Sequence, residues 1–249
     1  MKHIVSAYML FIIGLCFLFG IPAVVLGVIF LPRHTSLAFG RLVFGTTLRV
    51  AGIKVKVRGL EQLDPDKPYI FVGNHVNMLD PFVMVALVPR PFVAIEKKEN
   101  FKIPIYGWLM GRWGNIPIDR ENPEKARESM ISAGEVLRAK KEIVIVYAEG
   151  TRTRTGVVGP FKKGGFHLAV ETGVEVVPFT QVGAFRIMAH KTWFMRPGTY
   201  ELVLHPPIDP ATYGRERMDD LVRDTREQVL SAYDGPRELP AAEAAAVHS

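Results

Sequence analysis

The distribution of apolar and polar residues divides the chain near residue 50. Residues 4–31 form a run of 28 residues without a charged side chain. As one straight helix this run would extend about 42 Å, against about 30 Å for the hydrocarbon core of a bilayer. Gly20, Ile21 and Pro22 lie near its middle, and proline cannot donate the helical hydrogen bond, so we expect a kink or a break there. The run is either one tilted span or two short helices that form a hairpin in one leaflet, and we favour the hairpin.

Residues 33–50 continue with apolar side chains interspersed with arginines, which is typical of a helix near lipid headgroups. Residues 1–60 contain seven Lys or Arg residues and no Asp or Glu, which gives this part a charge of +7. The net charge of the whole chain is +6, so the remaining residues sum to −1. A basic end beside an apolar run favours an anionic membrane surface as its partner. No nucleic-acid-binding motif accompanies the charge. Residues 1–50 are therefore predicted to be a helical membrane anchor, either monotopic or single-span.

Beyond residue 50 the pattern becomes one of short β-rich runs alternating with helical segments. The predicted strands cover residues 53–57, 69–72, 92–95, 143–147, 174–177 and 200–204, and the predicted helices cover residues 82–88, 105–112, 123–140, 165–172 and 217–233. Strands that alternate with helices indicate a mixed α/β fold with a largely parallel sheet flanked by helices. We expect one globular domain over residues 51–234, and a disordered tail over residues 235–249. The single cysteine, Cys16, excludes an internal disulfide.

The stretch "YIFVGNHVNMLDPF" at residues 69–82 places His75 and Asp80 where an apolar strand ends. On one continuous helix these two side chains would point about 140° apart. Asp80 and Pro81 favour the start of a helix, so residues 74–79 are predicted to be a loop that brings the carboxylate back to the imidazole. Such a carboxylate fixes the tautomer of the imidazole and makes it a better base. The alternative is that Asp80 only caps its helix and His75 is an ordinary loop residue.

Such a base needs a hydroxyl to deprotonate, and the sequence offers no obvious enzyme nucleophile. None of the six serines lies near the motif or in a nucleophile elbow, and Cys16 lies in the apolar run. The seven histidines are scattered without a paired metal-binding motif, so we expect no metal and no redox cofactor. We therefore expect His75 to activate a hydroxyl of a bound substrate.

Three further stretches accompany the "NHVNMLD" motif. They read "WGNIPIDR" at residues 113–120, "VYAEGTRT" at 146–153 and "EVVPFTQVG" at 175–183. In order and spacing the four stretches resemble the conserved blocks of the glycerolipid acyltransferases, in particular the 1-acyl-sn-glycerol-3-phosphate acyltransferases. The resemblance covers about residues 50–210. One departure is that Tyr147 and Ala148 stand where the family usually has Phe-Pro.

The resemblance implies a role for each matching residue. His75 would be the general base and Asp80 its orienting partner. The substrate-binding residues would be Asn74, Lys98, Arg120, Glu149, Gly150, Thr151 and Arg152. Pro178 would shape the acyl side of the pocket. The match leaves the choice between Lys97 and Lys98 open.

A role for Arg120 and Arg152 in binding the acceptor phosphate also has a physical basis, because a phosphate monoester favours planar bidentate donors. The alternative makes Arg120 with Asp119, and Glu149 with Arg152, ordinary surface ion pairs. Backbone N–H groups around residues 74–76 are candidate donors to the oxyanion of the tetrahedral intermediate.

The expected reaction is direct acyl transfer to the sn-2 hydroxyl of lysophosphatidic acid. The donor would be an acyl thioester of coenzyme A or of acyl carrier protein, at the cytoplasmic face of the cell inner membrane. Two alternatives remain: an acyltransferase for glycerol 3-phosphate or another lysolipid, and a non-catalytic membrane-anchored lipid-binding protein.

Overall fold

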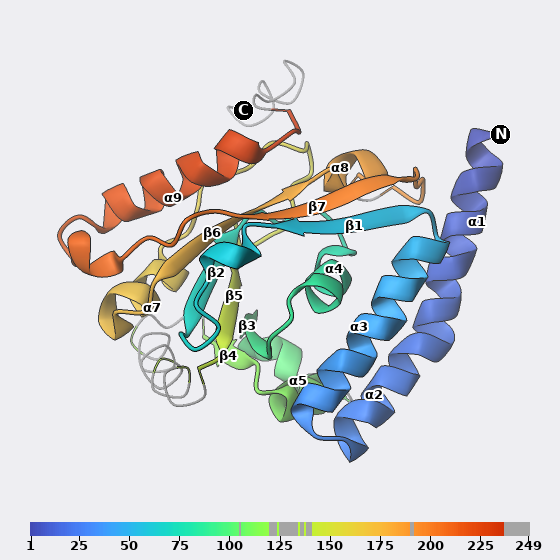
Figure 1. Ribbon diagram of the computed structural model, residues 1–249, viewed down its shortest axis with the longest axis horizontal. Coiled ribbons are helices and arrows are strands. Elements are labelled where there is room, and N and C mark those ends of the chain that lie inside the picture. The colour runs from blue at the N-terminus through green and yellow to red at the C-terminus, as the bar shows by residue number, and fades with distance from the viewer. Residues whose placement is uncertain are drawn as a thin grey trace.

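The computed structural model describes residues 1–104, 106–119, 124, 134, 137, 141–189 and 192–236. The described residues form a seven-stranded sheet with the strand order β1-β7-β6-β2-β5-β3-β4 (Figure 1). The strands are β1 (Ile53–Arg58), β2 (Tyr69–Gly73), β3 (Phe92–Lys97), β4 (Ile116–Ile118), β5 (Ile143–Tyr147), β6 (Val176–Val182) and β7 (Gly198–Leu204). Every neighbouring pair is parallel except β6 and β7. The predicted mixed, largely parallel sheet is confirmed.

Strand β2 lies in the middle of this sheet and is buried on both faces. Ile70 and Val72 pack with α7 (Gly164–Thr172) and α9 (Met218–Ala232) on one face. Tyr69 and Phe71 point to the other face, toward α3 (Arg33–Val50) and α4 (Asp80–Leu87). Side chains that alternate between two buried faces explain why this strand is a continuous apolar run. Its carboxyl end therefore delivers the residues that follow it into the interior of the domain.

Compared with the prediction, the structure has one additional short strand and one additional short α-helix, and one strand lies later in the chain than expected. Strand β4 and helix α8 (Ala184–Ile187) were not predicted, because elements of three or four residues show too little periodicity. The strand expected at 174–177 runs from Val176 to Val182 and so includes the polar residues Thr180 and Gln181. Helix α5 (Tyr106–Trp113) matches its expected position. The predicted helix over 123–140, apart from residues 124, 134 and 137, and the tail beyond residue 236 lie outside the described residues.

The N-terminal apolar run forms one continuous helix. Helix α1 (Lys2–Leu15), the π-helical turn η1 (Cys16–Gly20) and α2 (Ile21–Phe30) follow each other without a break. The prediction of two short helices separated at Pro22 is therefore wrong. The N–H of Ile21 donates to the oxygen of Cys16, five residues back, and this wider turn absorbs the local distortion that proline imposes. The chain reverses only at Pro32, and α3 then returns alongside the long helix (Figure 1).

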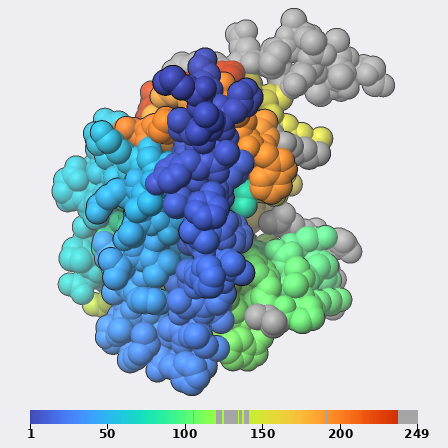
Figure 2. Space-filling model, turned by 90° about the vertical axis from the view of Figure 1, so that its right-hand side faces the viewer, coloured from blue at the N-terminus to red at the C-terminus, as the bar shows by residue number. Residues whose placement is uncertain are grey.

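This long helix lies against the domain instead of projecting from it. At its N-terminal end the N–H of Met195 donates to Oγ of Ser6 over 2.9 Å. At its C-terminal end Arg112 donates to the carbonyl oxygen of Ile29 over 2.8 Å. The outer side is open, because only 11% of the most apolar 18-residue window is buried. The molecule thus presents a long apolar helix along one side (Figure 2).

Candidate active site

The site begins where β2 ends in the centre of the sheet. Gly73 is required there, because a Cβ at this position would lie 2.2 Å from the carbonyl oxygen of Phe179 on β6. Residues 74–79 then form a loop, and helix α4 starts at Asp80, as predicted. Val76 and Leu79 of the loop are buried in one cluster with Met9 of α1. The N-terminal helix therefore packs directly behind the loop that carries His75.

The loop brings His75 and Asp80 into direct contact. Nδ1 of His75 lies 2.6 Å from Oδ2 of Asp80, which is fully buried, whereas 19% of the His75 side chain is exposed. The carboxylate also accepts the N–H of Val76 at 2.7 Å and the N–H of Asn77 at 3.2 Å. The N-cap residue of α4 is Leu79, and the Asp80 carboxylate accepts N–H groups of the preceding loop, so the interpretation of Asp80 as a plain helix cap does not fit. With its Nδ1 proton donated to Asp80, the imidazole keeps Nε2 as its basic nitrogen.

Two residues that sequence reasoning did not identify brace the carboxylate from the far side. The hydroxyl of Tyr200 on β7 donates to Oδ1 of Asp80 over 2.7 Å. In the amide orientation that satisfies its neighbours, Nε2 of Gln181 on β6 donates to Oδ1 at 2.8 Å and to Oδ2 at 3.0 Å. These donors offset the cost of burying the charge. The available signal for Gln181 was a polar pair, Thr180 and Gln181, at the end of an apolar run.

Two of the predicted oxyanion donors, the N–H groups of His75 and Val76, already have partners in this structure. The N–H of His75 donates to Oε1 of Glu149 over 2.9 Å, and the N–H of Val76 donates to Asp80. Asn74, predicted to bind substrate, is buried, and its Oδ1 accepts the N–H of Gln181 at 2.8 Å. Asn74 therefore ties the end of β2 to β6. The expectation that the N–H groups of His75 and Val76 bind an oxyanion is wrong for this conformation, because both face carboxylates.

Glu149, also expected at the acceptor, is buried and joins two loops. Its Oε1 accepts the His75 N–H, and its Oε2 accepts the N–H of Gly159 at 2.8 Å. Burial raises the pKa of the Glu149 carboxyl, whereas the two N–H groups and the charges nearby oppose this shift. Gly150 follows with φ +70°, and a Cβ there would lie 2.9 Å from Nζ of Lys162. Glu149 therefore positions the loop that carries His75, and the exposed residues of this block are Thr151 and Arg152.

The second block meets the segment after β3 through an ion pair. Nζ of Lys98 lies 2.6 Å from Oδ2 of Asp119, whereas Lys97 pairs with Glu99 at 3.5 Å. Lys97 lies opposite Ile118 in the sheet, but of the two lysines Lys98 is the one whose side chain pairs with a carboxylate of the second block. Arg120 follows Asp119 directly and lies outside the described residues. Pro178 lies on β6 opposite Val72 in the sheet, and its carbonyl accepts the N–H of His205.

The departure at residue 147 places a tyrosine against the imidazole. The rings of Tyr147 and His75 stack with their centroids 4.1 Å apart and an interplanar angle of 20°. The Tyr147 hydroxyl oxygen is buried. Burial raises the pKa of this hydroxyl well above its ordinary value, and the charge of Asp80 adds to the shift. The ring is therefore a flat support that restricts rotation of His75.

This contact gives a first prediction. The Tyr147→Phe protein keeps the stacked ring, and its kcat is expected to stay within about twofold of that of the unchanged protein. In Tyr147→Leu the support is lost, and we expect about 10- to 100-fold lower kcat with little change in either KM, because small misplacements of catalytic groups are costly. Steady-state kinetics in detergent measure both. Equal kcat values for the two variants would show that the ring does not position His75.

The comparisons with known proteins identify the family of the chain. A family model described as "Acyltransferase" matches residues 54–182. The chain is 33% identical to a 1-acyl-sn-glycerol-3-phosphate acyltransferase from Limnanthes douglasii, over 74% of this chain and 65% of that protein. It is 30% identical to an enzyme of the same name from Pseudomonas aeruginosa, over 73% of this chain and 69% of that protein. It thus spans just under two thirds of the plant relative's length.

A solved structure agrees as well. The crystal structure of the 1-acyl-sn-glycerophosphate acyltransferase from Thermotoga maritima matches with a TM-score of 0.71 and 25% sequence identity, over 92% of each chain. The matched family model covers the strand, loop and helix that carry the His75–Asp80 pair, as well as the block around Glu149. The chain belongs to the acyltransferase family.

Proposed function

We propose that this protein transfers an acyl group from an acyl thioester to the sn-2 hydroxyl of 1-acyl-sn-glycerol 3-phosphate, giving phosphatidic acid. The observation that carries the proposal is the 2.6 Å contact between His75 and the buried Asp80 at the carboxyl end of the central strand. The names of the matched relatives support the choice of reaction. The proposed acyl donor is a thioester of coenzyme A or of acyl carrier protein.

In the proposed mechanism His75 moves one proton twice. Its Nε2 takes the proton of the acceptor hydroxyl as the oxygen attacks the thioester carbonyl carbon, and Asp80 stabilises the imidazolium that forms. The tetrahedral intermediate then collapses, the C–S bond breaks, and the thiolate recovers the proton from His75. Direct transfer is supported by the surroundings of His75, where the described side-chain contacts are Asp80 and Tyr147 and not a serine or cysteine.

The acceptor phosphate is proposed to bind the cations of the second and third blocks. Arg152 is exposed directly after the loop that Glu149 anchors, and Lys98 lies beside Asp119. An arginine can bind a phosphate through two parallel N–H···O bonds. Arg120 completes the proposed set.

Removal of one such contact should weaken binding of the acceptor more than binding of the acyl donor. In Arg152→Ala we expect the acceptor KM to rise about 10- to 100-fold, the equivalent of one hydrogen bond to a charged group, with the donor KM nearly unchanged. Arg58→Ala is the matched control, because Arg58 ends β1, which runs opposite to β2 and so ends at the far edge of the sheet. A raised donor KM in Arg152→Ala would instead assign this arginine to the thioester side.

The long N-terminal helix is proposed to lie in the plane of the membrane, at the cytoplasmic face of the cell inner membrane. Ser6 near one end and Ile29 near the other both contact the same domain, so a helix crossing the bilayer would have to leave these contacts. Its open outer side suits burial at the headgroup and acyl boundary. Two basic residues among the first sixty are engaged elsewhere: Arg33 pairs with Glu142 and donates to the carbonyl of Phe92, and Arg58 pairs with Glu201. The other basic residues are proposed to face anionic lipid.

The proposed reaction is tested with a panel of acceptors. Purified protein is given an acyl thioester together with lysophosphatidic acid, glycerol 3-phosphate or lysophosphatidylcholine, and the products are identified by mass spectrometry. We expect phosphatidic acid from lysophosphatidic acid at a rate at least tenfold above the other acceptors. Preferred acylation of another acceptor would change the assigned substrate. Lipid binding without any turnover would favour the non-catalytic alternative.

A further inference from the structure

Outside the first fifty residues, few large apolar side chains of the described chain are exposed. Among the described residues beyond residue 50, the exposed large apolar side chains are those of Ile103, Tyr106, Trp108 and Trp193. Scattered exposed apolar residues need no explanation, but a set gathered around one feature does. These four lie at the two ends of the long N-terminal helix.

The first three belong to the segment that supports the C-terminal end of this helix. Arg112 of α5 donates through Nε to the carbonyl of Val28 at 3.1 Å, and through a second nitrogen to that of Ile29. The same guanidinium lies 5.9 Å from the ring centroid of Trp108, whose exposed fraction is 54%. Trp108 is therefore held beside the last turn of α2.

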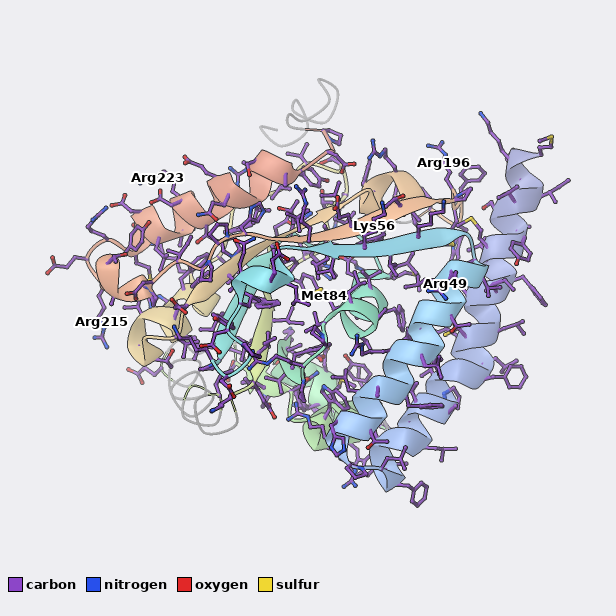
Figure 3. The ribbon with its side chains drawn as sticks, in the orientation of Figure 1. Arg49, Lys56, Met84, Arg196, Arg215 and Arg223 are labelled. Carbon is purple, nitrogen blue, oxygen red and sulfur yellow. The ribbon has the colours of Figure 1, made fainter. Side chains whose placement is uncertain are left out.

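Trp193 lies at the opposite end. Its exposed fraction is 76%, the largest among the aromatic residues outside the first fifty. The next residue, Phe194, meets the ring of His3 edge-on with centroids 5.5 Å apart, and Met195 bonds Ser6 of α1. Arg196 lies over the Phe194 ring and beside the N-terminal end of α1 (Figure 3).

Both segments also share a face of the molecule. Figure 2 shows the segment around α5, in green, and a large orange surface from the region of α8 and β7 on the same side of the N-terminal helix. A basic side chain lies at each end: Arg112 over the ring of Trp108, and Arg196 over the ring of Phe194, the residue after Trp193. Indole rings prefer the boundary between headgroups and acyl chains, and basic side chains near them bind anionic lipid.

We propose that Trp108 and Trp193 are two additional lipid contacts that insert into the headgroup region of an anionic bilayer, one at each end of the long helix. A single helix lying in a membrane leaves the domain free to rotate about the helix axis. Two further contacts on the same side would fix this rotation and hold one face of the domain toward the lipid. The inference rests on the proposed membrane association and is independent of the proposed chemistry.

The three tryptophans of the chain, Trp108, Trp113 and Trp193, allow a direct test. Three variants each keep one tryptophan, with the other two replaced by phenylalanine, and are bound to phosphatidylcholine–phosphatidylglycerol vesicles whose acyl chains carry bromine. Trp113 is the internal control, because its Nε1 donates to the carbonyl of Phe92 inside the protein. We expect at least about twofold quenching of Trp108 and Trp193 on binding, and little quenching of Trp113, because interfacial indoles reach the upper acyl chains.

A second variant measures the energetic contribution of these contacts. Trp108→Ser combined with Trp193→Ser should weaken vesicle binding by about tenfold or more, while activity on detergent-dispersed acceptor stays within about twofold, since the lost contacts are to lipid. Vesicle-bound protein whose Trp108 and Trp193 are quenched no more than Trp113 would overturn the proposal. Shielding of both indoles by dimer formation without vesicles would also overturn it, and would assign the face to a second copy of the chain. Loss of activity with normal quenching would count against the proposed reaction alone.

Discussion

Replacement of His75 by alanine is expected to lower kcat by about 10²- to 10⁴-fold, the range typical of removing a general base. None of the described side chains in contact with His75 is placed to take the proton instead. Asp80 is fully buried behind the imidazole, Tyr147 stacks on its face, and both oxygens of Glu149 accept backbone N–H groups. The fold should persist, since the side chain of His75 is itself partly exposed and the loop is held by Asp80, Glu149 and the buried amide of Asn74. Turnover of purified protein in detergent measures the loss.

His167→Ala is the matched control, because His167 lies on α7 and lines a separate charged cavity with Lys163, Glu171 and Arg215. This variant should keep the turnover of the unchanged protein. A His75→Ala protein that is folded, binds vesicles and retains more than about a tenth of normal kcat would remove His75 from the role of base.

Asp80→Asn is expected to be nearly as damaging, for two separate reasons. The amide no longer stabilises the imidazolium and permits the wrong tautomer, which we expect to cost about 10²- to 10⁴-fold in kcat. In addition, the new NH₂ group replaces one carboxylate oxygen and therefore faces a donor: the N–H of Val76 if it replaces Oδ2, or the hydroxyl of Tyr200 if it replaces Oδ1. Buried donors that lose an acceptor cost about 1–3 kcal/mol each, so a lower Tm should accompany the loss of turnover.

Tyr200→Phe separates these two reasons, because it removes one donor to Asp80 and leaves the charge in place. We expect this variant to lose no more than about tenfold in kcat, since a single hydrogen bond to a charged group is at stake. If Asp80→Asn instead matches Tyr200→Phe in turnover, the carboxylate supports the loop and does not orient the base.

The sequence predicted the local features of this site well. The long apolar run of β2, the glycine that ends it and the Asp80-Pro81 helix start are short-range signals, and together they predicted that His75 and Asp80 would meet. The bracing residues could not be predicted in the same way. Gln181 and Tyr200 reach Asp80 from β6 and β7, and their positions depend on the order and register of strands far apart in the chain. Glu149 was expected at the substrate, and only its bonds to the His75 and Gly159 N–H groups reveal a positioning role.

The N-terminal end shows where a local rule fails. The proline rule predicts a distortion near Pro22, but it does not say whether the chain breaks or widens one turn. Here the turn widens, and the N–H of Ile21 bonds Cys16. Contacts with the domain at Ser6 and Ile29 keep the helix along its surface. Such contacts are tertiary, so hydropathy could not predict them, and the hairpin that we favoured from the sequence is not what the structure shows.

The fate of a labelled acyl group tests the central claim most directly. Protein in excess is mixed with a radiolabelled acyl thioester, with or without lysophosphatidic acid, and stopped within one turnover. We predict that with acceptor the label passes to phosphatidic acid as free thiol appears in equal amount, and that without acceptor the thioester stays intact and the protein carries no label. Label bound covalently to the protein in the absence of acceptor, or thiol release without phosphatidic acid in its presence, would contradict direct transfer by the His75–Asp80 pair.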